Sequence, residues 1–244
     1  MELEKEDTMR DYALIGDIHS QYRPLWEALA YCQNNALIPV ILGDVFDSRC
    51  DFSDSVGVYQ LLRQAQKDLG AVILRSNHQD KLERYLKGNN VQVSPELQRT
   101  LDDFAASEVD PAHLLAWLES LPYGFCFKFQ GREYRCSHAY FPSWIEIPDY
   151  PIFHFVRDVP KKARSLMMYG PHQREGKGRA FWWEGETERQ WVRVAGHYHV
   201  VHQSDKNLVL DAGCGGTKRS WFCEESPALV LWDCSRKELV EIAS

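Results

Sequence analysis

Three apolar runs near the start of the chain alternate with helical segments, and this alternation restricts the fold more than any other feature. The runs cover residues 12–18, 38–42 and 71–74, and helical spacing marks the segments between them, including residues 55–69. Short buried strands separated by helices predict a parallel sheet with crossover helices. We therefore predict an α/β fold that binds its ligand at the carboxyl ends of these strands.

The remaining chain divides into a helical stretch and a β-rich stretch. Residues 79–121 are polar with helical spacing, and Pro95 and Pro111 stand where helices would start, so we expect a cap-like insertion. Residues 141–189 are loop-rich. No linker or repeat interrupts the chain, and we expect residues 1–244 to form one domain. The predicted later strands are a hairpin over 123–129 and 133–137, then 190–201, 207–211, 228–233 and 238–242.

Composition narrows the class of protein. The chain has 244 residues, of which 44% are hydrophobic, and a net charge of −7. The acidic balance argues against stable nucleic-acid binding, and we expect no membrane association because no segment has the length and apolarity of a membrane helix. Seven cysteines, without a C-x-x-C pair, argue against a disulfide framework or a thiolate zinc site. We therefore expect a cytoplasmic protein.

Polar side chains follow each of the three apolar runs. Asp17 and His19 end the first run, Asp44 follows the second, and Asn77 and His78 follow the third. Carboxylate, imidazole and carboxamide groups are ligands for transition metals such as manganese, iron and zinc. Each residue alone has an ordinary alternative, a loop carboxylate or a solvated histidine. Later candidates of the same kind are His138, His197 and His199.

The order of the motifs G-D-x-H, G-D-x-x-D, N-H, S-H-A and G-H-x-H resembles the calcineurin-like metallophosphoesterase superfamily. The similarity is greatest to its phosphoprotein-phosphatase-type branch, which includes bacterial serine/threonine phosphatases, diadenosine tetraphosphatases and the phosphatase domain of polynucleotide kinase-phosphatase. LRSNHQ (74–79), ARSLMMYG (163–170) and LVLDAGCGG (208–216) carry this similarity. The resemblance implies a four-layer sandwich of two mixed β-sheets flanked by helices.

The same resemblance implies two divalent metal ions, with manganese favoured and iron, zinc or nickel as alternatives. Asp44 would bridge the two ions because its carboxylate has two oxygens. His199 matches a ligand of the wider superfamily but often not of this branch, so its role stays open. The implied ligands are Asp17, His19, Asp44, Asn77, His138, His197 and His199.

The resemblance also assigns the catalytic roles. A metal-bridging hydroxide would attack phosphorus, and His78 would act as general acid for the leaving group. Asp47 matches the acidic residue that orients this histidine, although it equally suits a helix cap. Asp211 matches a carboxylate that supports a histidine ligand.

Phosphate-binding arginines are the weakest part of the match. The family's G-D-x-x-D-R-G motif has arginine where this chain has Ser48, and Arg49 follows one position later. Arg164, in ARSLMMYG, is the better candidate of the two. Tyr140 stands where the family has glycine, so we expect a reshaped pocket.

These features predict a metal-dependent phosphoric ester hydrolase that acts on phosphomonoesters, either phosphoproteins or small phosphoesters. The alternative is hydrolysis of dinucleotide polyphosphates or nucleotide phosphodiesters at the same metal centre. A non-catalytic interaction module is a third hypothesis. The complete ligand set and His78 argue against this third hypothesis.

Overall fold

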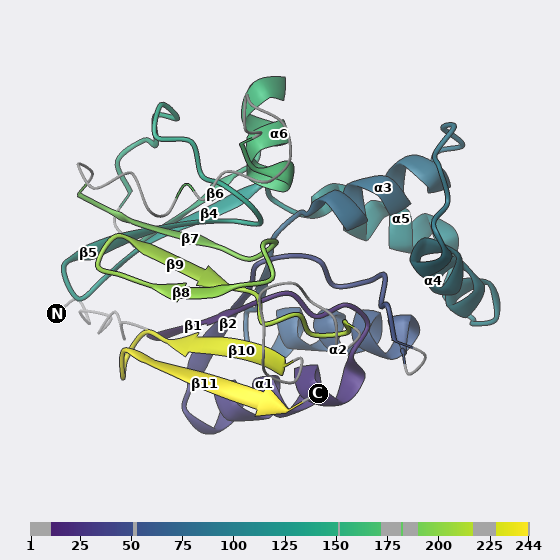
Figure 1. The fold of residues 1–244 in the computed structure, drawn as a ribbon, viewed down its shortest axis with the longest axis horizontal. Coiled ribbons are helices and arrows are strands. Elements are labelled where there is room, and N and C mark those ends of the chain that lie inside the picture. The colour runs from purple at the N-terminus through teal and green to yellow at the C-terminus, as the bar shows by residue number, and fades with distance from the viewer. Residues whose placement is uncertain are drawn as a thin grey trace, which may run out of the picture.

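The computed structural model describes residues 11–50, 53–150, 152–171, 182, 190–216 and 228–243. Two β-sheets pack face to face (Figure 1). Helices α1 (Tyr22–Asn34) and α2 (Ser55–Asp68) cover the outer face of one sheet, and α6 (Lys161–Tyr169) lies over the other. This is the predicted four-layer arrangement.

The first sheet has the strand order β11-β10-β1-β2-β3. Strands β1, β2 and β3 run parallel, as the alternation of apolar runs and helices predicts, whereas β10 and β11 are antiparallel. The first predicted strand ends early, at Ile15, because the chain then turns into the site, where the Ile18 and His19 amides donate to the Asp44 carbonyl oxygen. The strands are β1 (Asp11–Ile15), β2 (Leu37–Ile41), β3 (Val72–Ile73), β10 (Ala228–Asp233) and β11 (Glu238–Ala243).

The second sheet is also mixed, with the order β6-β4-β5-β7-β9-β8. The predicted hairpin is confirmed: Gln130 and Gly131 connect β4 and β5, and both have a positive φ, as a tight two-residue turn requires. The strands are β4 (Gly124–Phe129), β5 (Arg132–Ser137), β6 (Phe153–Val156), β7 (Val192–Ala195), β8 (Val201–Gln203) and β9 (Asn207–Leu210).

One sequence prediction about this sheet is wrong. Residues 190–201 do not form one strand, because the chain leaves the sheet after Ala195 and pairs again only from Val201. Residues 141–189, predicted to be loop-rich, also contain β6 and α6 between their loops. The rest of that segment includes residues 172–181 and 183–189, which lie outside the described residues.

Three further helices stand beside the sandwich (Figure 1). They are α3 (Asn77–Leu86), α4 (Pro95–Ala105) and α5 (Pro111–Ser120). Pro95 and Pro111 lie in the first turns of their helices, as predicted. None of the described helices is long and apolar enough to cross a membrane.

Two apolar layers hold the strand ends in place. Between the sheets, buried side chains such as Leu14 and Phe127 interlock, and outside the first sheet Phe46 packs edge-on against Phe104 of α4. Burial of each such side chain is worth roughly 1.5–3 kcal/mol. The loop that follows β2 is therefore fixed between the sheet and the helical insertion.

Candidate functional site

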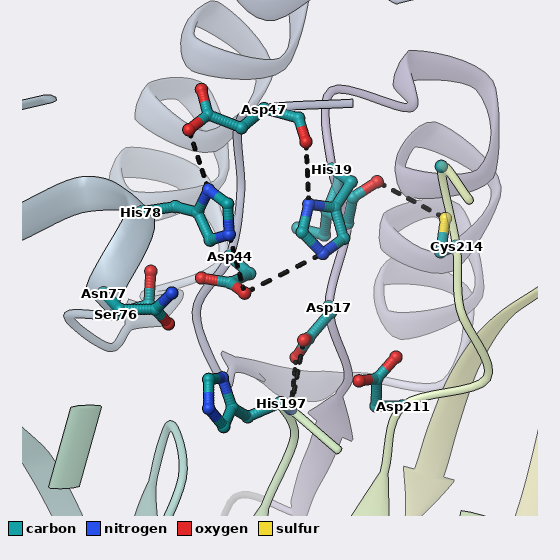
Figure 2. Close-up of polar contacts among 12 residues, drawn as sticks. Asp17, His19, Asp44, Asp47, Ser76, Asn77, His78, His197, Asp211 and Cys214 are labelled. Atoms are coloured by element: carbon teal, nitrogen blue, oxygen red, sulfur yellow. Dashed lines mark hydrogen bonds and ion pairs between the residues drawn. The ribbon is translucent and has the colours of Figure 1, made fainter. Parts of the chain in front are cut away.

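The predicted polar residues meet where strands of both sheets end. Asp17, Asp44 and Asn77 follow β1, β2 and β3, while His138 and His197 follow β5 and β7. Figure 2 shows the rings of His19 and His78 side by side, both directed at the same oxygen of Asp44, with Asp47 beyond both rings. The carboxyl ends of strands from two sheets thus converge on one buried polar cluster.

Asp17, His19 and Asp44 form the first group that can hold a cation, with one ligand atom from each lying within 4.8 Å of the others. His19 Nδ1 lies 3.1 Å from the carbonyl oxygens of both Phe46 and Asp47, so this nitrogen carries the proton and donates it. Nε2 is left as an acceptor, 3.8 Å from Asp44 Oδ2. Burial lowers the pKa of His19, which favours the neutral form that binds metals.

Asp44, His138 and His197 form the second group. His138 Nδ1 donates to the Leu42 carbonyl oxygen at 3.1 Å, which leaves Nε2 directed into the cluster. This Nε2 lies 3.4 Å from Asp44 Oδ1, 2.9 Å from Asn77 Oδ1 and 3.0 Å from His197 Nδ1. Asp44 belongs to both groups, so it is placed to bridge two cations.

The electrostatics of the cluster suit cations. Burial, together with the nearby carboxylates of Asp211 and Asp44, raises the pKa of Asp17 well above its ordinary value. Burial also opposes ionisation of Asp44, but His138, His78 and His19 outweigh it and hold its pKa well below the ordinary value. A divalent cation bound here would relieve the repulsion among these carboxylates. The residues present therefore fit the metal ions that the sequence implies.

Several residues of the site have a backbone φ in the positive range. A positive φ is unfavourable for residues other than glycine, yet five site residues adopt one. They are His19 (49°), Asp44 (42°), Asp47 (65°), His197 (72°) and His199 (52°). These conformations turn the chain sharply after the strands, and three of the five residues, His19, Asp44 and His197, belong to the ligand groups.

Close packing explains why two positions of the motifs, 43 and 196, are occupied by glycine. A Cβ on Gly196 would collide with Asp17 Oδ1, and the neighbouring His197 amide donates to both oxygens of that carboxylate, at 3.2 and 3.0 Å. A Cβ on Gly43 would lie 2.8 Å from His138 Nδ1, and its φ is +118°. Both glycines allow ligands from different sheets to approach each other.

His78 and Asp47 form a direct pair next to the cluster. His78 Nδ1 donates to Asp47 Oδ2 at 2.7 Å, and His78 Nε2 lies 3.8 Å from Asp44 Oδ2. Burial disfavours the charged form of His78, but Asp44 and Asp47 outweigh it and raise its pKa to about 9. The helix-cap alternative for Asp47 does not apply, because Asp54 caps α2.

His199 is not a member of either ligand group among the described residues. Its backbone amide donates to Asp211 Oδ2 at 2.6 Å, and its Nδ1 lies 3.6 Å from the same oxygen. Asp211 also accepts from the Gly213 amide at 3.0 Å. Asp211 therefore braces the loop that carries His197 and stands close to Asp17.

The two predicted phosphate-binding arginines do not contact the ligand cluster in the described part of the chain. Arg164 Nε donates to the Val159 carbonyl oxygen at 2.8 Å, and its guanidinium lies 5.4 Å from the centre of the Tyr123 ring. Arg49 is exposed and interacts electrostatically with Glu96. Both arginines stay predictions as phosphate-binding residues.

The residues at the positions that depart from the family motifs have structural partners. Ser48 is buried, and its Oγ lies 3.0 Å from Cys50 Sγ and 3.1 Å from Gln21 Nε2. Tyr140 packs its ring 4.0 Å from the guanidinium of Arg193. Ser48 therefore braces its own loop.

Lys81 is a candidate phosphate-binding cation that the sequence alone did not point to. It follows His78 by three residues on α3, on the same face of the helix, and its charge acts against the protonation of His78. Lys81 is partly buried and makes no hydrogen bond or ion pair with the described residues. The helical spacing from His78 was the signal that could have identified it.

Neither a protein-family model nor a curated protein sequence matches the chain. Solved structures do. A putative diadenosine tetraphosphatase is 17% identical and has a TM-score of 0.60, with 97% of this chain and 94% of that chain covered. A protein serine/threonine phosphatase from Saccharomyces cerevisiae is 10% identical, with a TM-score of 0.51 and coverages of 98% and 82%. A cold-active protein-tyrosine phosphatase of a Shewanella species is 15% identical, with a TM-score of 0.50 and coverages of 96% and 80%.

At these low sequence identities, the similarity to the three solved structures shows a shared fold and nothing beyond it. The described residues form two mixed sheets flanked by helices, and this architecture is the calcineurin-like metallophosphoesterase fold. The predicted fold class is therefore confirmed.

Proposed function

We propose that this chain, which has the calcineurin-like metallophosphoesterase fold, is a metal-dependent hydrolase of phosphoric esters that acts on phosphomonoesters. The observation that carries the proposal is Asp44, whose two oxygens face separate ligand groups while the His78–Asp47 pair stands alongside. Two bound divalent cations would neutralise the phosphoryl oxygens and lower the pKa of a water between them.

The ligand set supports this chemistry. We assign Asp17 and His19 to one cation, His138 and His197 to the other, and Asp44 to both. Asn77 Oδ1, 2.9 Å from His138 Nε2, adds a neutral oxygen ligand to the second site. Mixed nitrogen and oxygen ligands without thiolate favour manganese, with iron, zinc or nickel as the alternatives.

His78 supplies the proton that the leaving group needs. Hydroxide, formed when a water gives up one proton to solvent, would form the new bond to phosphorus, while the ester P–O bond breaks and the departing oxygen keeps the electron pair. The Asp47 carboxylate stabilises the charged form of His78, and this imidazolium can transfer its Nε2 proton to that oxygen. Asp47 fixes the tautomer by accepting the Nδ1 proton.

A cationic side chain beside His78 would help to hold the substrate phosphate. Lys81 satisfies this need better than Arg49 or Arg164, because it lies next to His78 and has no competing ion pair in the described part of the chain. Its ammonium group is therefore the proposed phosphate-binding cation.

Dinucleotide polyphosphates are the second candidate substrates. One solved structure of the same fold is named a putative diadenosine tetraphosphatase, and this chain has Ser48 where the family motif has its arginine. Loss of that arginine would weaken contacts to a dianionic monoester more than contacts to a diester.

A substrate panel tests the proposal. Purified protein with Mn²⁺ is assayed on p-nitrophenyl phosphate, bis(p-nitrophenyl) phosphate, a phosphopeptide and diadenosine tetraphosphate, with His78→Asn as the control for the acid. We expect monoester hydrolysis, and a loss of about 10²–10⁴-fold in kcat for the phosphopeptide in His78→Asn. Hydrolysis of only the diester and the dinucleotide would establish the alternative, and inactivity on all four would overturn both.

A further inference from the structure

Thr100 of α4 contacts the carboxylate that orients His78. Its hydroxyl donates to Asp47 Oδ1 at 2.8 Å and accepts from the Asp47 backbone amide at 3.2 Å. Asp47 Oδ2 is already used by His78 Nδ1. The two oxygens of Asp47 are thus divided between one residue of the helical insertion and the proposed general acid.

Both members of this contact are almost completely buried, at 1% exposure each. Bulk water has little access to this contact, and in the described part of the chain Thr100 is the hydrogen-bond donor to Asp47 Oδ1. Asp47 also has a φ of +65°, a conformation that needs support from outside its own loop. The hydrogen bond between the Asp47 amide and Thr100 supplies that support.

The hydroxyl of Thr100 has two acceptors within reach. One is the Glu96 carbonyl oxygen one turn earlier in its own helix, at 3.4 Å, which is the usual partner of a buried helical threonine. The other is Asp47 Oδ1, at 2.8 Å and 53 positions away in the sequence. Because the hydroxyl has a single proton, the shorter contact to the charged carboxylate is the favoured one.

The surrounding contacts hold α4 against the same loop. Phe104 packs edge-on against Phe46, with ring centres 5.5 Å apart, and Arg99 Nη2 donates to the Ser48 carbonyl oxygen at 2.9 Å. The residues on each side of Asp47 are therefore fixed by α4 as well. Thr100 reaches the carboxylate from a rigid position.

We propose that Thr100 is a positioning residue, whose hydroxyl fixes the Asp47 carboxylate and through it aims His78 Nε2 at the departing oxygen. This proposal rests on the proposed function. It connects the helical insertion with the proton-transfer step, although Thr100 touches neither substrate nor metal ligands.

Two leaving groups test the proposal. Phenyl phosphate needs a proton on its departing oxygen, whereas 2,4-dinitrophenyl phosphate does not. We expect Thr100→Val to lower kcat for phenyl phosphate by about 10- to 100-fold and to leave KM, bound metal and the dinitrophenyl reaction within about threefold of wild type. Thr100→Ser keeps the hydroxyl and should restore kcat. Ser94→Ala, which removes the α4 N-cap without touching Asp47, controls for loosening of the helix.

A second readout does not depend on activity. In metal-free protein with ¹⁵N-labelled histidine, the Nδ1 proton of His78 should give a downfield, slowly exchanging NMR signal, assigned by its absence in His78→Asn. We expect Thr100→Val to broaden or remove this signal, and Thr100→Ser and Ser94→Ala to keep it. An unchanged signal in Thr100→Val, or equal losses of kcat on both substrates, would overturn the proposal. Inactivity of the wild-type protein would instead refute the proposed function, and the NMR comparison would still decide the role of Thr100.

Discussion

His138 Nε2 and His197 Nδ1 lie 3.0 Å apart, although the two residues are 59 positions apart in the sequence. The Nδ1 proton of His138 is donated to Leu42, so its Nε2 is free to act as an acceptor. Two imidazoles directed at one point, beside the Asp44 carboxylate, form a site that a cation would stabilise.

The first prediction concerns this pair. His138→Ala removes one ligand and leaves His197 and Asp44 with a vacant coordination position. We expect the affinity for Mn²⁺ to fall by more than the roughly 10- to 100-fold that is typical when a residue supporting a ligand is changed. Isothermal titration of chelator-treated protein measures the loss. His113→Ala is the matched control, since His113 is an exposed histidine of α5 that belongs to neither ligand group; equal affinities in the two variants would contradict the assignment of His138.

The second prediction concerns Gly196. Alanine at this position places a methyl group against Asp17 Oδ1, so the carboxylate must move away from His197. We expect weaker metal binding together with a lower Tm of the metal-free protein. Gly131→Ala, at the exposed β4–β5 turn, should cost roughly 1 kcal/mol because of its positive φ without any effect on metal affinity. Normal metal affinity in Gly196→Ala would show that Asp17 does not need its present position.

The third prediction concerns the charge of His78. Because its pKa is raised to about 9, the metal-free protein should keep the imidazolium through neutral pH and lose the proton as the pH rises through about 9. The imidazolium–carboxylate pair contributes its full stabilisation of the folded state at pH values below the ordinary histidine pKa. This stabilisation is lost as the pH rises through about 9. NMR titration of labelled histidine measures this pKa directly. Asp47→Asn removes one of the two carboxylates and should shift the titration to lower pH; a midpoint near that of a free histidine in the unaltered protein would refute the pairing.

The fourth prediction separates the candidate phosphate-binding cations. Lys81→Met keeps the length of the side chain and removes its charge. We expect KM for p-nitrophenyl phosphate to rise roughly tenfold with less change in kcat, since a charge-assisted hydrogen bond is worth about that factor. Arg164→Met is the comparison, and it should change KM little because Arg164 already donates to Val159. A rise in KM for Arg164→Met alone would return the role to the arginine that the family motif suggests.

The sequence allowed the candidate site residues to be picked out because they follow strands that are clearly apolar. Asp17, Asp44 and Asn77 come directly after buried runs, and parallel strands bring such positions to one edge of a sheet. The helix starts at Pro95 and Pro111 were predictable for a similar reason, since proline is favoured in the first helical turn.

The errors came from features that depend on tertiary structure. Residues 190–201 read as one strand because apolar residues continue past Ala195, but positive φ values at His197 and His199 break the pairing to aim ligands. Thr100 could not be identified from its neighbours in sequence, because its role exists only when α4 docks beside Asp47. The helix α6 has nine residues, too few for a clear periodic signal between loops.

Metal-dependent turnover in the wild-type protein and in Asp44→Asn tests the central claim most directly. Asp44→Asn keeps the shape of the side chain that belongs to both ligand groups but removes its negative charge. Chelator-treated wild-type protein should be inactive on p-nitrophenyl phosphate and regain activity with added Mn²⁺, whereas Asp44→Asn should stay at least about 10²-fold less active at every Mn²⁺ concentration. Full activity in the chelated protein, or equal activation of Asp44→Asn, would contradict the account.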